Sequence, residues 1–88
     1  MVNITKLNDY LIINGDVDTF PFKNSKIYIP KSSIYFIIDE SNAVLFKCVY
    51  GNYTLLTVNV NNLQLNGENI SKENLIEKFD ALVNNITE

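Results

Sequence analysis

The sequence contains no histidine, no arginine, no tryptophan and a single cysteine, Cys48. Without histidine the chain lacks the commonest metal ligand and general base, and Cys48 has no familiar base to activate it as a nucleophile. One cysteine cannot form a disulfide within the chain, and we expect Cys48 to be a small buried hydrophobic residue in a strand. The composition therefore argues against an enzyme, and we expect neither a metal nor a cofactor.

Positive charge is scarce as well, and the formal net charge is −3. Nucleic-acid binding relies on phosphate neutralisation and arginine forks, so a nucleic-acid partner is not expected. The weakest alternative function is a small barrel that binds single-stranded nucleic acid by stacking the bases on tyrosines.

Asp16 and Asp18 lack the further ligands and the glycine of a calcium loop, so we interpret them as a solvated turn. With no run of about 18 apolar residues and no basic leader, we expect no membrane partner and no signal-peptide secretion.

Runs of β-branched and aromatic residues alternate with turn formers, which is typical of short β-strands. The predicted strands cover residues 10–13, 26–29, 33–38, 44–50 and 53–60. Pro30 stops the second of these and suits a strand at a sheet edge. The pattern predicts an α+β fold: a single domain over residues 1–88, with a small antiparallel meander in residues 1–60 and one C-terminal helix.

A predicted hairpin between the last two strands determines which side chains share a face. Gly51-Asn52 has the glycine-first order of a two-residue type II′ turn, which places Cys48 opposite Leu55 and Phe46 opposite Thr57. The predicted core face contains Ile34, Phe36, Ile38, Val44, Phe46, Cys48 and Leu55. The opposite face contains Tyr35, Ile37, Leu45, Lys47, Val49, Thr54, Leu56 and Val58. Since antiparallel sheets usually have one polar face, either the sheet curls into a barrel or sandwich or another protein covers this apolar face.

Residues 71–86 have the pattern of an amphipathic helix. Ser71 suits the N-cap position, and Glu73 lies near the positive end of the helix dipole. The apolar stripe consists of Leu75, Ile76, Phe79, Leu82, Val83 and Ile86. Glu73, Glu77 and Asp80 form a separate acidic stripe whose like charges disfavour an isolated helix. We therefore expect the helix to depend on docking its apolar stripe against the sheet.

Residues 62–83, NLQLNGENISKENLIEKFDALV, combine a short strand, an Asn-Gly-Glu turn, a serine cap and a helix beginning Glu-Asn-Leu. This pattern resembles small virion structural proteins of tailed phages, crAss-like phages in particular. The resemblance implies a capsid-decoration, head-fibre or tail-associated protein that acts by assembly. It also implies a virion location, after synthesis in the bacterial host cytoplasm, with further copies of the chain or other virion subunits as partners.

Two functional hypotheses remain open at this point. In the first, the protein is a structural component whose second sheet face contacts neighbouring subunits. The candidate contact residues are Tyr35, Ile37, Leu45, Val49, Leu56 and Val58. In the second, it is a small acidic phage-encoded inhibitor or adaptor, and Glu73, Glu77 and Asp80 occupy a basic cleft on the target.

Overall fold

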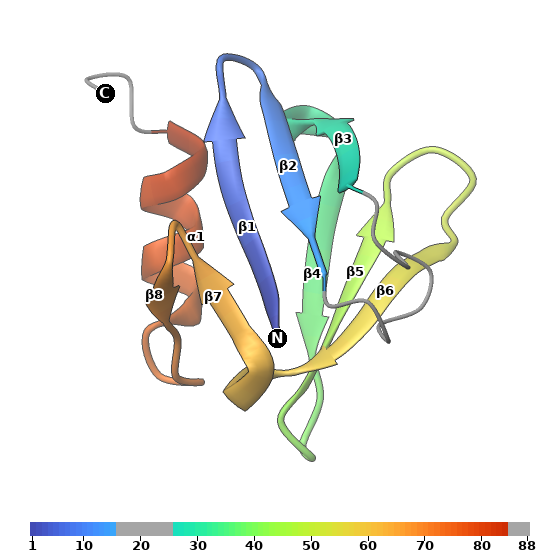
Figure 1. The fold of residues 1–88 in the computed structure, drawn as a ribbon. Helices are drawn as coiled ribbons and strands as arrows, with labels where there is room; N and C mark the ends of the chain where they lie inside the picture. Colours follow the sequence, from blue (N-terminus) through green and yellow to red (C-terminus); the bar gives the residue numbers. More distant parts are fainter. Residues whose placement is uncertain (16–25, 85–88) are drawn as a thin grey trace.

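In a computed structural model of the chain, residues 1–15 and 26–84 are described, and they form two β-sheets and one helix around a shared core (Figure 1). The predicted α+β class is confirmed. All five predicted strands are present, with ends within two residues of the expected ones. The two sheets remain separate in their strand pairing, so the described residues form no closed barrel.

The larger sheet has the strand order β3-β2-β1-β7-β8. Its first three strands, β1 (Val2–Leu7), β2 (Tyr10–Asn14) and β3 (Lys26–Pro30), form an antiparallel meander. Strand β7 (Leu63–Leu65) pairs with β1 in parallel and β8 (Glu68–Asn69) pairs with β7. Strand β1 is absent from the predicted set, and its parallel pairing departs from the predicted meander. Pro30 lies at the edge of this sheet, as expected.

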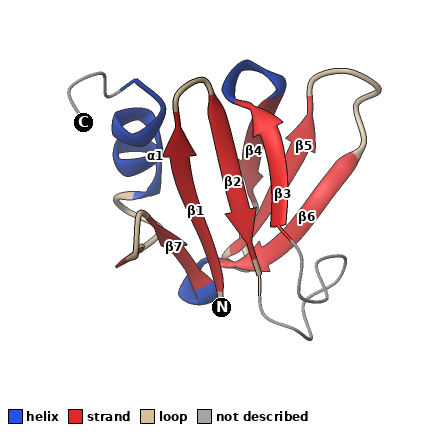
Figure 2. Cartoon of the chain, turned by 45° about the horizontal axis from the view of Figure 1, so that its top comes forward, coloured by secondary structure: helices blue, strands red, loops and turns tan. Residues whose placement is uncertain are grey.

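The smaller sheet is a second antiparallel meander of β4 (Ile34–Ile38), β5 (Ala43–Cys48) and β6 (Thr54–Asn59). The chain changes from one sheet to the other through two short 3₁₀ turns, Lys31–Ser33 and Val60–Asn62 (Figure 2).

The two 3₁₀ turns are held in the same way. The Lys31 amide donates to the Asp9 carbonyl at 2.9 Å, and the Val60 amide donates to the Asn42 carbonyl at 2.8 Å. Asp9 and Asn42 lie in the first hairpin loop of their respective meanders. Each meander therefore ties the turn that follows it to its own first loop, and residues 1–33 and 34–62 repeat one topology.

The core lies between the two sheets. It combines Ile4, Leu11 and Ile13 of the larger sheet with Val44 and Phe46 of the smaller one, all with no exposed area. Cys48 is a free buried thiol, which confirms the structural role expected for it. Two sheets that each bury one face against the other explain why buried residues occupy alternate positions in strands such as β2 and β5.

Helix α1 (Leu75–Asn84) contributes Leu75 and Phe79 to this core. The Phe79 ring packs edge-on against Phe36 with ring centroids 5.0 Å apart, and also contacts Phe46 of the smaller sheet at 6.2 Å. The predicted docking of the helix is confirmed. The predicted stripe is wrong at Ile76, which is 68% exposed, and its last member, Ile86, lies outside the described residues.

The start of the helix also differs from the prediction. The α-helix begins at Leu75, after a turn over residues 72–74, and not at residue 71. At Ser71 the backbone amide donates to Asn74 Oδ1 at 2.9 Å, and the Ser71 carbonyl accepts from the Asn74 amide at 3.2 Å. This reciprocal arrangement satisfies polar backbone groups at the helix start, as a capping box does.

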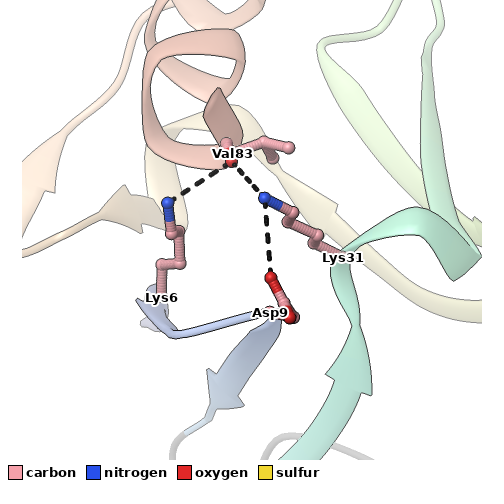
Figure 3. A network of polar contacts seen from close by, with 4 residues as sticks. All are labelled: Lys6, Asp9, Lys31 and Val83. Carbon is pink, nitrogen blue, oxygen red and sulfur yellow. Dashed lines mark hydrogen bonds and ion pairs between the residues drawn. The ribbon is translucent and has the colours of Figure 1, made fainter. Parts of the chain in front are cut away.

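The other end of the helix is held by two lysines (Figure 3). The ammonium groups of Lys6 and Lys31 donate to the Val83 carbonyl at 3.5 and 3.3 Å, and Lys31 also lies 4.0 Å from an Asp9 carboxylate oxygen. Positive charge is favourable at the C-terminal end of a helix because it faces the negative end of the dipole. These contacts join the last turn of α1 to strand β1 and to the 3₁₀ turn before β4, and through Lys31 to Asp9 in the β1–β2 loop.

The predicted hairpin register is wrong beyond the turn. Val44 pairs with Val58 and Phe46 with Leu56, and a bulge between Phe46 and Lys47 shifts the register near the turn. The connection is the longer loop of residues 49–53, closed by a hydrogen bond from the Cys48 amide to the Tyr53 carbonyl at 3.0 Å. Since one extra residue reverses the orientation of every side chain beyond it, Leu56 and Val58 point into the core, not away from it.

Candidate interaction surfaces

Three of the six residues predicted for the apolar contact face of the smaller sheet are exposed. Tyr35 and Ile37 on β4 are 37% and 46% exposed, and Val49 beyond β5 is 49% exposed. Ile37 pairs directly with the half-buried Leu45. We call these four residues the β4–β5 face. The two further residues predicted for it, Leu56 and Val58, are buried at 3% and 8% exposure and do not belong to it.

Two exposed tyrosines flank the β4–β5 face in the β5–β6 loop. Tyr50 is 77% and Tyr53 is 56% exposed. The loop is fixed to the face by the Tyr35 hydroxyl, which donates to Asn52 Oδ1 at 2.8 Å. The loop therefore extends the exposed aromatic surface in a set position.

A second apolar face, on the larger sheet, is absent from the sequence prediction. It consists of Leu7, Tyr10, Ile12, Tyr28 and Pro30, which we call the β1–β3 face. Cross-strand pairs connect these residues: Leu7 lies opposite Tyr10, and Ile12 lies opposite Tyr28. Leu7, Tyr10 and Tyr28 are 55%, 47% and 58% exposed. The alternation of Tyr28 and Pro30 with Ile27 and Ile29 in residues 26–30 could have indicated this second face, but only once β1 is recognised as the third strand of the sheet.

The acidic residues of the helix region are all exposed. Glu73 lies in the turn before α1, and Glu77 and Asp80 lie on the helix itself. Asp80 Oδ1 accepts a hydrogen bond from the Asn84 side chain at 2.8 Å. The structure thus presents the three carboxylates to solvent, as the second hypothesis requires, although Glu73 is not part of the helix.

Among the residues that the structure describes, two side chains, Asp39 and Tyr53, have shifted pKa values. Asp39 Oδ1 accepts from the Ser41 hydroxyl at 2.7 Å and from the Ser41 and Ala43 amides at 2.9 and 3.0 Å. The Ser41 hydroxyl bond, followed by the Ala43 amide bond, lowers the pKa of Asp39 below its usual value. Hydrogen bonding with the Cys48 side chain raises the pKa of the Tyr53 hydroxyl.

The described residues contain neither a cluster of three metal ligands nor a helix long and apolar enough to span a membrane. Within residues 1–15 and 26–84, no three side chains of histidine, cysteine, aspartate or glutamate lie close enough together to hold a metal ion. Asp16 and Asp18, interpreted from the sequence as a turn, lie outside these ranges. Among the same residues, α1 is far too short to cross a membrane. The features that stand out among the described residues are the two exposed apolar faces and the exposed carboxylates.

Comparison of the chain with protein-family models, with curated proteins and with solved structures found no match.

Proposed function

We propose that the protein is a non-enzymatic assembly component of a phage particle, and that it binds neighbouring subunits through the β4–β5 and β1–β3 faces. The observation that carries this proposal is the presence of an exposed apolar face on each of the two sheets. Both faces are turned away from the core that the sheets share. A subunit with two separate contact faces can bind two neighbours at once, which a repeating assembly requires.

The composition of the faces supports protein contact. Tyrosine and branched aliphatic residues dominate both faces, and interfaces of permanent assemblies are apolar in the same way as a domain core. Burying one such side chain contributes about 1.5–3 kcal/mol. Several exposed together, as here, form the kind of patch that marks an interaction site.

The proposal is tested by light scattering on size-exclusion fractions and by mass spectrometry of purified phage particles. We expect the protein to be a particle component and to associate with itself or with a virion subunit. Ile37→Lys should weaken contacts of the β4–β5 face, and Tyr28→Lys those of the β1–β3 face. Asn61→Lys, at an exposed site in the second 3₁₀ turn, is the matched control. A monomer that is absent from particles, or association unaffected by both face variants, would refute the proposal.

The alternative is a small acidic inhibitor or adaptor. It is favoured by the exposure of Glu73, Glu77 and Asp80, which lie in helix α1 and in the turn before it. A variant with all three changed to lysine decides between the two. Loss of activity against a host defence system with unchanged particle incorporation would favour the inhibitor, and unchanged activity in both assays would exclude it.

A further inference from the structure

A groove of about 220 Å³ runs between strand β4 and helix α1. Its walls are apolar on both sides, formed by Ile34 and Phe36 from the strand and by Ile76, Phe79 and Val83 from the helix. For comparison, an apolar cavity of about 150 Å³ in another protein takes up benzene. The groove is therefore large enough to accept apolar side chains from a binding partner.

Strand β4 forms one wall of the groove and is an edge strand. In the part of the chain that the structure describes, β5 pairs with one side of β4 and no strand pairs with the other. Its sequence, IYFII, contains neither a charge nor a proline, the two features that commonly protect an exposed edge. An extended peptide can add to such an edge through main-chain hydrogen bonds while its alternate side chains enter a neighbouring groove.

The helix wall shows that the groove is not filled by the protein's own packing. Ile76 lines the groove and is 68% exposed, although it belongs to the apolar side of the helix sequence. Phe79, one turn further along, is only 9% exposed because the phenylalanine cluster covers it. A large apolar side chain that lines a groove and remains exposed is a natural contact for a partner.

The charges at the groove favour a basic partner. Two charged residues line it, Lys31 and Asp80. The Lys31 ammonium already binds the Val83 carbonyl and lies 4.0 Å from the Asp9 carboxylate. Asp80 is exposed, and Glu77 adds a second exposed carboxylate on the same helix. Attraction between these carboxylates and a cationic residue would guide and orient the bound segment.

We propose that this groove binds an extended peptide segment of a partner protein, with apolar residues at alternate positions and a flanking lysine or arginine. The peptide adds to the edge of β4 as a new strand and places its apolar side chains against Ile76, Phe36 and Phe79. The side chains that line this groove are not those of the two sheet faces, although β4 contributes to the groove and to the β4–β5 face, and the inference does not depend on the proposed assembly role.

The test uses the full chain and three labelled synthetic peptides: KITVTIK, its acidic counterpart EITVTIE and a scrambled version of the basic one. We expect fluorescence anisotropy to show binding of the basic peptide, with weaker binding of the other two. Ile76→Asp should weaken this binding roughly tenfold, since it removes the exposed apolar contact. Asp80→Lys should reduce the preference for the basic peptide. Both positions are exposed, and circular dichroism will confirm that the variants fold.

Controls separate this inference from the proposed function. Tyr28→Lys on the β1–β3 face should leave peptide binding unchanged, and amide chemical-shift changes on binding should concentrate in residues 34–38 and 75–84. No binding by the basic peptide, equal binding by all three, or shifts centred on β6 or on the β1–β3 face would overturn the inference. Self-association that Ile76→Asp abolishes would also overturn it, because a second copy of the chain would then be the occupant.

Discussion

Docking of α1 depends on Phe79, and Phe79→Ala tests this dependence. The Phe79 side chain is 9% exposed and its ring contacts Phe36 and Phe46 at centroid distances of 5.0 and 6.2 Å. Replacement by alanine removes this buried ring and leaves a cavity between the helix and the smaller sheet. The acidic residues of the helix region contribute no compensating attraction to the core, because they are exposed.

The expected loss of stability is large relative to the whole domain. Truncation of a buried phenylalanine to alanine costs about 3–5 kcal/mol. A chain of this length is expected to unfold with a free energy of roughly 4–13 kcal/mol. Phe79→Ala should therefore remove at least about a quarter of the stability, and at the lower end of the stability range it would unfold the domain. Phe79→Leu keeps most of the apolar volume but loses the ring contacts, so we expect a cost of about 1 kcal/mol.

The assay is urea unfolding followed by circular dichroism, with Ile76→Ala as the matched control on the same helix. Because Ile76 is 68% exposed, its truncation should change the free energy of unfolding by no more than about 0.5 kcal/mol. One contrary result is a free energy of unfolding of Phe79→Ala within about 1 kcal/mol of the wild-type value, and another is an equal cost of truncation to alanine at positions 76 and 79. Either result would show that the phenylalanine cluster does not hold the helix and that the packing described for it is wrong.

Two further predictions concern the loops. Gly51 and Gly67 have similar positive φ angles, +82° and +83°. Their surroundings differ, because a Cβ added at Gly51 would lie 3.2 Å from Tyr53 Cδ1, whereas a Cβ added at Gly67 would have no atom within 4 Å. Both alanine variants should cost about 1–2 kcal/mol for the backbone conformation, and thermal unfolding should show Gly51→Ala to be the less stable; the reverse order would contradict the loop geometry. The lowered pKa of Asp39 means that its contribution to stability is present above about pH 4 and disappears as the pH falls through the lowered value. In acid titrations of unfolding, Asp39→Asn should therefore be less stable than the wild type at pH 7 and approach it in acid, while Glu40→Gln serves as control; a difference that is constant with pH would exclude this account.

The error in the β5–β6 register shows that the alternation of apolar residues along a strand is a stronger signal for register than the type of the preceding turn. The turn-based register pairs no residue correctly, although it places Thr54 on the correct, outer side, where Thr54 pairs with Lys47 and accepts a hydrogen bond from its ammonium group at 3.0 Å. After Thr54, the bulge reverses the side of the sheet on which each β6 side chain lies. The alternation in residues 56–60, LTVNV, already places Leu56, Val58 and Val60 on one side and two polar residues on the other. Burial of apolar side chains determines register, so this alternation deserved more weight than the turn type.

Other parts of the fold follow directly from local sequence. The phenylalanine at position 79, the proline at the sheet edge and the buried cysteine all occupy places that their chemistry predicts. The parallel pairing of β1 with β7 could not be foreseen in this way, because it joins Val2 to Leu63 and no local pattern specifies so distant a partner. The groove between β4 and α1 could not be predicted either, because its two walls are distant in the sequence.

The two meanders have the same topology, but the sequence pattern indicated the exposed face of the second one only, and the β1–β3 face of the first was missed. No repeat is visible in the sequence, yet each meander runs through three strands to a 3₁₀ turn that is anchored to its own first loop. In both meanders one side faces the shared core and the other faces outwards, and in both the outward side carries tyrosine and aliphatic residues. Selection for folding alone places no such demand on an outward face, since polar residues serve there equally well. Two departures from that pattern, one on each sheet, are what the proposed contacts with neighbouring subunits would require, and an outward face made polar on either sheet would not have supported that proposal.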